Sequence, residues 1–218
     1  MRCLAFDCSS SSLSIALVEN HLTIAEKTLC NQASHSELLV YEINNLLQQN
    51  NLNFFDLDLA VSTNGPGSFT AIRVALATLK TIQIATKIPC FSITASEVMA
   101  FKYRQIDSPI NVIIEANNSE VYYAKYRIID QETAEIIAPI IINNDKISEL
   151  IAKNEFVCGL VTNKNLVVNA SSSGLDDRIL GSEVANLGIK KFVDKNFSSH
   201  ILPLYLREPN ITLRKKKL

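Results

Sequence analysis

The sequence is short of the residues from which phosphate-binding loops are built. It contains only six glycines, namely Gly65, Gly67, Gly159, Gly174, Gly181 and Gly188. Tryptophan is missing altogether. A phosphate cradle needs a backbone that approaches its ligand closely, which glycine permits at low cost. The glycines of the second half do not cluster, and no G-x-x-x-x-G-K-[ST] motif occurs. This shortage argues against a kinase that acts alone.

Histidine and cysteine are too scattered for a recognisable metal site. The three histidines, at positions 21, 35 and 200, form no pair spaced to place two ligands on one helix face. The five cysteines include no C-x-x-C pair, which predicts reduced thiols instead of a disulfide framework or a zinc site. We therefore expect no bound metal. A nucleophile elbow of the form G-x-S-x-G is missing as well.

Long apolar runs and an excess of one charge are missing too. No apolar run approaches the roughly 20 residues of a membrane span, and Asp7 with a serine run interrupts the N-terminal stretch. Lys and Arg number 21 against 22 Asp and Glu, so no global field favours a nucleic-acid partner. We expect a cytoplasmic protein without membrane contact. Its 47% hydrophobic content supplies the core of one large domain or two small ones.

The most informative segment runs from Asn64 to Arg73 and reads N-G-P-G-S-F-T-A-I-R. Gly65 and Gly67 allow unusual backbone dihedrals, and Ser68 or Thr70 can cap a following helix. The segment therefore predicts a strand, a tight loop and a helix N-terminus. Such a loop suits an anion, because backbone N–H groups point at one place, or it serves only as a sharp corner.

Hydrophobic periodicity predicts an order of elements that begins with three strands. Alternating apolar residues indicate strands over residues 2–6, 13–18 and 22–30. The period then becomes helical over residues 36–49, where Ser34 and Glu37 form a capping-box pattern. A strand over 57–61, a helix over 70–86, a strand over 90–93 and a helix from about 95 follow. This order predicts an α/β fold with a mixed sheet and helices on its faces, the ribonuclease-H-like layout.

The opening hairpin recurs in the second half. A strand over residues 111–115 ends in Glu115, as the first strand ends in Asp7, and a polar turn and a strand over 121–128 follow. We expect a duplicated fold with lobes at residues 1–105 and 106–218, the second degenerate, and a final segment, about 200–218, that packs back on the first lobe. The alternative is chance similarity between two hairpins.

The expected architecture points to a cleft between the lobes. Proteins of this architecture hold nucleotide phosphates there, with an acid at the end of each first strand. The candidate cleft residues are Asp7, Ser9, Gly65, Gly67 and Glu115.

Several motifs together resemble one family. They are the strand ending in Asp7, the helix start Ser34-His35-Ser36-Glu37, the glycine segment, and Pro203-Leu204-Tyr205-Leu206-Arg207. This set is similar to the bacterial TsaB (YeaZ) family, a non-catalytic paralogue of TsaD with a duplicated actin-like or sugar-kinase-like fold. The chain departs from that family at Asn117-Asn118, where arginines are usual, and at Glu115, where aspartate is usual. Any function of that turn is therefore in doubt here.

The resemblance implies a scaffold for threonylcarbamoyl transfer to the adenosine beside the anticodon of tRNA. It implies a heterodimer with TsaD, the ATPase TsaE in a ternary complex, a homodimer when alone, and indirect contact with tRNA. It implies no cofactor bound independently, with ATP or ADP at a shared interface. TsaD carries an H-x-x-x-H metal pair that this sequence lacks. The alternative is a stand-alone actin-like nucleotide-binding ATPase or kinase.

The helix over residues 70–86 shows two apolar faces. Ile72, Leu76 and Leu79 form one, and small residues dominate the other. One face would cover the sheet and the second would dock a partner; the alternative is a helix sandwiched within one chain. The expected partner interface comprises Ser36, Leu39, Ile43, Ala71, Arg73, Val74, Ala75, Thr78 and Ile82.

Arg73 is unusual because a cation in the first helical turn opposes the helix dipole. We expect a carboxylate partner for it, within the chain or across an interface. An exposed arginine that tolerates the small penalty is the alternative.

Overall fold

The structure is a computed structural model that describes residues 1–30, 35–161, 171–172 and 178–207, with the side chains of residues 35–37 and 171–172 left undescribed. None of the helices in these ranges is both long and apolar enough to cross a membrane. The five cysteines all lie in the described ranges and form no disulfide.

The first half of the chain folds into a five-stranded mixed sheet. Its strands run in the order β3-β2-β1-β4-β5. β1 pairs antiparallel with β2 and parallel with β4, which in turn pairs parallel with β5. The strands are β1 (Arg2–Asp7), β2 (Ser12–Glu19), β3 (Leu22–Cys30), β4 (Leu59–Thr63) and β5 (Cys90–Ile93). The helices between them are α1 (His35–Gln49), η1 (Phe54–Asp56) and α2 (Phe69–Thr86), and α3 (Ala95–Lys102) follows.

The second half repeats this topology in a second sheet of order β10-β9-β6-β7-β8. β6 pairs antiparallel with β7 and parallel with β9, as β1 pairs with β2 and β4. The strands are β6 (Ile110–Glu115), β7 (Glu120–Ile129), β8 (Glu132–Asn143), β9 (Phe156–Leu160) and β10 (Ser171–Ser172). The remaining helices are η2 (Asn144–Lys146), α4 (Ile147–Leu150) and α5 (Gly181–Val193). The duplicated ribonuclease-H-like fold predicted from the sequence is therefore confirmed.

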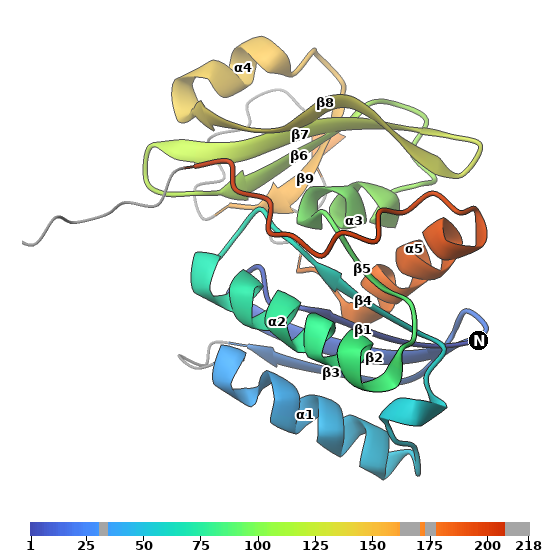
Figure 1. The fold of residues 1–218 in the computed structure, drawn as a ribbon. Coiled ribbons are helices and arrows are strands. Elements are labelled where there is room, and N and C mark those ends of the chain that lie inside the picture. The colour runs from blue at the N-terminus through green and yellow to red at the C-terminus, as the bar shows by residue number, and fades with distance from the viewer. Residues whose placement is uncertain (31–34, 162–170, 173–177, 208–218) are drawn as a thin grey trace, which may run out of the picture.

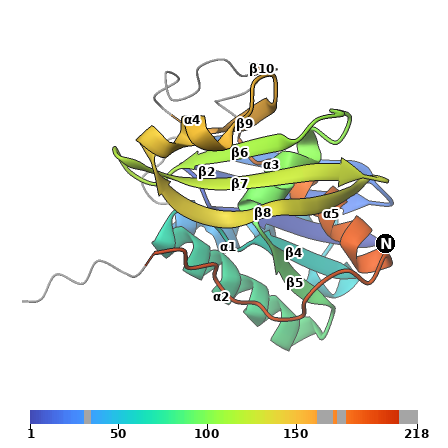
Figure 2. The same ribbon diagram turned by 90° about the horizontal axis from the view of Figure 1, so that it is seen from above.

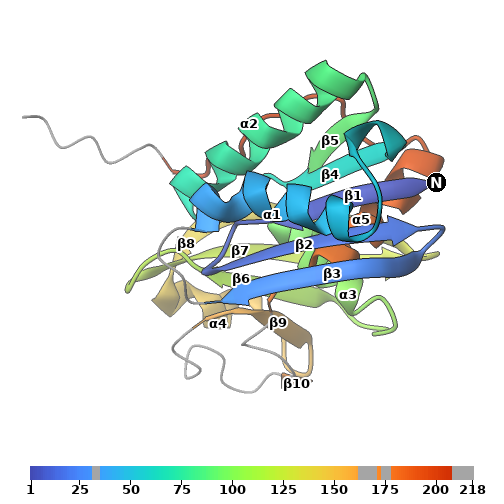
Figure 3. The same cartoon turned by 90° about the horizontal axis from the view of Figure 1, so that it is seen from below.

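The elements stack in layers (Figure 1). α1 and α2 cover the outer face of the first sheet, α3 and α5 lie between the two sheets, and α4 lies on the outer face of the second. In the view from above, the second sheet lies over the first (Figure 2). In the view from below, α1 and α2 lie side by side beneath the first sheet (Figure 3).

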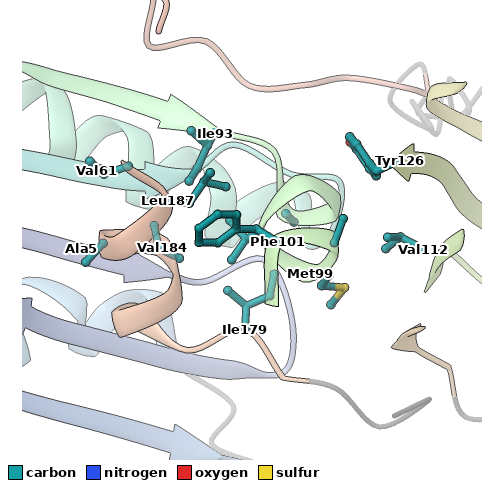
Figure 4. Close-up of a cluster of buried hydrophobic side chains, with 14 of the residues drawn as sticks. Ala5, Val61, Ile93, Met99, Phe101, Val112, Tyr126, Ile179, Val184 and Leu187 are labelled. Carbon is teal, nitrogen blue, oxygen red and sulfur yellow. The ribbon is translucent and has the colours of Figure 1, made fainter. Parts of the chain in front are cut away.

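Strand β1 is apolar at nearly every position because both faces of the first sheet are covered. Leu4 and Phe6 pack into the cluster under α1 and α2, while Cys3 and Ala5 face the cluster between the sheets. Figure 4 shows this second cluster, in which Val184 and Leu187 of α5 lie against the first sheet and Val112 and Tyr126 come from the second. A shared core therefore joins the two halves.

Two boundaries differ from the sequence-based expectation. β4 begins two residues later than expected, because the unforeseen turn η1 ends just before Leu57. After residue 180 the chain also leaves the second half, since α5 packs on β1, β2 and β4 of the first sheet. Gly188 permits this contact, because a Cβ there would lie 2.7 Å from Val61 Cγ2. The first lobe thus takes up α5 as well as residues 1–105.

Candidate functional site

The glycine segment forms a sharp corner that packs against the turn between β1 and β2. Gly67 has φ +154°, and a Cβ at this position would lie 2.0 Å from the carbonyl oxygen of Ser9. The N–H of Ser68 donates to that same oxygen at 2.7 Å. Ser68 is the N-cap residue of α2, but its side chain makes no capping hydrogen bond. This corner turns a donor of the loop toward the protein's own backbone.

Asp7 lies at the end of β1, beside this corner, and is fully buried. Its Oδ1 accepts hydrogen bonds from the N–H of Ser9 at 3.2 Å, from Ser9 Oγ at 2.7 Å and from Thr63 Oγ1. Its Oδ2 has no hydrogen-bond partner in the part of the chain that the structure describes. Burial is the largest influence on the carboxyl group, and it raises the pKa of Asp7 against the opposing effect of these hydrogen bonds.

The nucleotide cleft expected around Asp7 and Ser9 stays a prediction, and the structure shows how its candidate residues lie. Both side chains are buried, at 0% and 5% exposure, and they bond to each other. Gly65 is buried and Gly67 contacts Ser9, whereas Glu115 is half-buried at the end of β6. In this arrangement the protein itself covers the side chains of Asp7 and Ser9. Within the described ranges, no three His, Cys, Asp or Glu side chains gather closely enough to hold a metal ion.

Replacing Asp7 by asparagine is expected to stabilise the protein at neutral pH. The folded state holds the Asp7 proton more tightly than the unfolded state, so wild-type stability is highest below about pH 4 and falls as pH rises through the folded pKa. Asparagine keeps the Oδ1 acceptor without a charge. Its melting temperature should exceed that of wild type by a few degrees at pH 7 and match it near pH 4.

Thermal melting of both proteins between pH 4 and 8 checks this. Asp7→Ala is the matched control, because it removes the acceptor of Ser9 and Thr63 and should lower stability at every pH. If the melting temperatures of wild type and Asp7→Asn change with pH in parallel, burial does not raise the pKa of Asp7.

The two faces expected on α2 are one broad face. Ala71, Ala75 and Ile82 are buried in the same cluster as Ile72, Leu76 and Leu79. Leu39 and Ile43 of α1 belong to this cluster too, both at 0% exposure. The reason is that α1 lies beside α2, so that α2 packs against the sheet and a neighbouring helix at once. Five of these residues were expected in the partner interface and lie instead in the protein's own core, namely Leu39, Ile43, Ala71, Ala75 and Ile82.

The exposed apolar residues of the two helices are different ones. Val40 and Tyr41 of α1 are 55% and 62% exposed, and Ile84 of α2 is 68% exposed. We define the outer helix surface as Val40, Tyr41, Val74, Ala77, Thr78, Thr81 and Ile84. Val74 and Thr78, which the sequence placed in the interface, are half-buried at its margin. Ser36 lies within α1, but its side chain is outside the described part.

Arg73 has aromatic partners instead of the expected carboxylate. Its guanidinium lies 3.7 Å from the centre of the Phe69 ring, and its Nε donates to the hydroxyl of Tyr205 at 2.6 Å. The rings of Phe69 and Tyr205 are 5.1 Å apart. A cation over an aromatic face gains enough to offset an unfavourable helix dipole. The sequence motif around Tyr205 therefore closes over the start of α2.

Residues 201–204, just before Tyr205, pack along the first lobe. The N–H of Leu204 donates to the carbonyl of Asn64 at 2.9 Å, and Asn64 Nδ2 donates to the carbonyl of Leu202 at 3.1 Å. Ile201 is buried in the cluster under α1 and α2. Arg207 then forms an ion pair with Glu120 of the second sheet at 3.3 Å. We call residues 196–207 the C-terminal strap, which runs across Figure 1 in red.

Known proteins similar to this chain agree with the fold. The chain is 31% identical over 127 residues to the tRNA threonylcarbamoyladenosine biosynthesis protein TsaB of Bacillus subtilis, an overlap of 58% of this chain and 56% of that protein. The Escherichia coli protein of the same name is 25% identical over 129 residues, covering 58% and 55% of the two chains. The matched region thus spans about half the length of these relatives.

Solved structures match over nearly the full length. YeaZ from Pseudomonas aeruginosa superposes with a TM-score of 0.81 at 17% identity, covering 94% of this chain and 99% of that one. An uncharacterized Pseudomonas aeruginosa protein with similarity to peptidase YEAZ gives a TM-score of 0.82 at 19% identity, with the same coverage. At these identities the likeness establishes the fold.

The family comparison covers most of the chain. The family model described as TsaD, tRNA N6-adenosine threonylcarbamoyltransferase, matches residues 26–197. With the TsaB relatives and the YeaZ fold, this match shows that the chain belongs to the TsaD family, in its TsaB (YeaZ) branch.

Proposed function

We propose that this chain is a non-catalytic partner subunit in the synthesis of threonylcarbamoyladenosine in tRNA. Its relatives are named as biosynthesis proteins for that modification. In our proposal the chain pairs directly with TsaD, joins TsaE in a ternary complex, and forms a homodimer when TsaD is absent. TsaD carries out the transfer, so tRNA meets this subunit only through the complex.

The outer helix surface carries this proposal. Large apolar side chains on two adjacent helices are 55 to 68% exposed. Their contact with water is unfavourable, and burying them against a partner would stabilise the complex. The small residues Ala77 and Thr81 precede Ile84 by about two turns and one turn of α2, and their size allows another helix to approach closely. A surface of this composition suits a helix pair from a partner subunit.

The arrangement around Asp7 supports a scaffold over an enzyme. The hydroxyl groups of Ser9 and Thr63 both donate to Oδ1 of Asp7, so these groups bond to one another within the fold. Residues that could cradle a phosphate are packed into the corner at Gly67. If ATP or ADP takes part, our proposal places it at the interface with the partner subunit.

Turnover of ATP by the isolated protein separates the scaffold from a stand-alone ATPase or kinase. We expect no phosphate release with magnesium above that of a mock purification, because the polar groups of the corner are used within the fold. Asp7→Asn is the matched variant, since it keeps the Oδ1 acceptor and is expected to stay folded. Steady turnover that Asp7→Asn abolishes would establish the enzyme instead.

A further inference from the structure

A cavity of about 420 Å³ opens at the β5 end of the first sheet, beside the C-terminus of α5. Its walls come from five places: the residue after β4, β5, the start of α3, the end of α5 with Lys195 after it, and the strap. The lining residues are Asn64, Phe91, Ser92, Ile93, Thr94, Glu97, Lys191, Lys195, Asn196, Phe197 and Ser198. Neither Asp7 nor any residue of the outer helix surface lines it, and of the glycine segment only Asn64 does.

Two side-chain atoms in the wall of this cavity are buried and have no hydrogen-bond partner among the described residues. They are Asn64 Oδ1 and Ser92 Oγ. Asn64 is held in place by its backbone, since its N–H donates to Ile93 and its carbonyl accepts from Leu204, each at 2.9 Å. Turning its amide over would leave the carbonyl of Leu202 without its donor, so one polar group stays unpaired in either orientation. Such groups in native proteins call for a water or a ligand.

The charge around the cavity favours an anion. Lys191 Nζ lies 2.8 Å from Glu97 Oε1, which also accepts a hydrogen bond from Thr133. The ammonium of Lys195 makes no ion pair with any residue in the described ranges, and Lys195 is exposed at the rim. Two ammonium groups therefore face one carboxylate. The net positive charge would attract a small anion into the cavity.

Aromatic rings form the apolar part of the cavity wall. Phe197 of the strap lies 4.7 Å from Phe91 of β5 and 5.5 Å from Phe192 of α5, measured between ring centres. This aromatic stack fixes the strap against the sheet and holds Lys195 and Asn196 at the rim.

We propose that this cavity binds a small organic anion that also carries hydroxyl groups. Its carboxylate or phosphate pairs with Lys195, and its hydroxyl groups bond to Asn64 and Ser92, which a slight shift of the strap would uncover. The volume falls in the range of small-molecule sites, roughly 300–1,000 Å³. The site does not depend on the proposed role as a partner subunit.

The test is an NMR titration of the isotope-labelled full chain with three matched probes. Glycerol 3-phosphate and glycerate carry an anion and hydroxyl groups, and glycerol carries hydroxyl groups alone. We expect saturable shifts of the Asn64, Ser92 and Asn196 amide signals with at least one anion and none with glycerol. The stronger of the two anions identifies the class as phosphate or carboxylate.

Three variants connect the shifts to the site. Lys195→Ala should weaken binding about tenfold, and Ser92→Ala should weaken it as well. Lys153→Ala, an exposed lysine beyond the second sheet, should change nothing. The fold of each variant is checked by its unperturbed signals elsewhere. No saturable shift at about 10 mM of either anion, or equal weakening by Lys195→Ala and Lys153→Ala, would overturn the proposal and leave a water-filled cavity.

Discussion

Ile84→Glu is expected to abolish association with TsaD from the same organism while leaving the fold intact. Ile84 is 68% exposed near the C-terminal end of α2, so the charge costs the isolated chain little. In a complex through the outer helix surface, the carboxylate would lose its water without gaining a partner. We expect affinity to fall about 100-fold or more, measured by titration calorimetry.

Ile129→Glu is the matched control for that substitution. Ile129 is 54% exposed on β7 of the second sheet, far along the chain from α1 and α2. It receives the same change of side chain outside the outer helix surface, and it should leave the affinity unchanged. If both variants bind TsaD as wild type does, the outer helix surface is not the interface. If Ile84→Glu melts well below Ile129→Glu, the loss of binding reports unfolding instead.

Gly67→Ala adds a single methyl group and is expected to destabilise the protein strongly. The new Cβ would lie 2.0 Å from the carbonyl oxygen of Ser9, and φ at this position is +154°. The corner and the β1–β2 turn would have to separate, breaking the bond from the Ser68 N–H to Ser9. We expect a loss of about 3 kcal/mol or more in the free energy of unfolding, measured by urea denaturation.

Ser68→Ala serves as the neighbouring control. The Ser68 side chain is exposed and makes no capping hydrogen bond, so its removal should cost less than about 0.5 kcal/mol. Equal unfolding curves for the two variants would mean that the corner accommodates the new methyl group at little cost, which would contradict the close packing against Ser9.

Local sequence patterns were sufficient for much of the fold. The apolar run of β1, the alternation of β2, the polar turn between them and the recurrence of this pattern at Glu115 identified the duplicated topology, because register and turn chemistry are local. The return of α5 to the first sheet was not predicted. It depends on the contact of Gly188 with Val61, and pairs so distant in sequence leave no periodic signal.

The site was predicted less well because burial depends on neighbours. Ala75 and Ile82 sit on a small-residue face that suits either a partner or α1, and only the packed structure distinguishes the two. The Tyr205 partner of Arg73 lies 132 residues away, so a dipole argument could recognise the anomaly without its solution. The capping box expected at Ser34 lies outside the described residues.

The most direct test of the account is the threonylcarbamoyladenosine content of tRNA in cells depleted of this chain. Digested tRNA is analysed by mass spectrometry after depletion and after complementation with wild type, Ile129→Glu or Ile84→Glu at equal protein levels. The account predicts that the modified nucleoside falls steeply on depletion, returns with wild type and Ile129→Glu, and stays low with Ile84→Glu. Unchanged content after depletion would contradict the proposed function, and full rescue by Ile84→Glu would contradict the interface through which it is proposed to act.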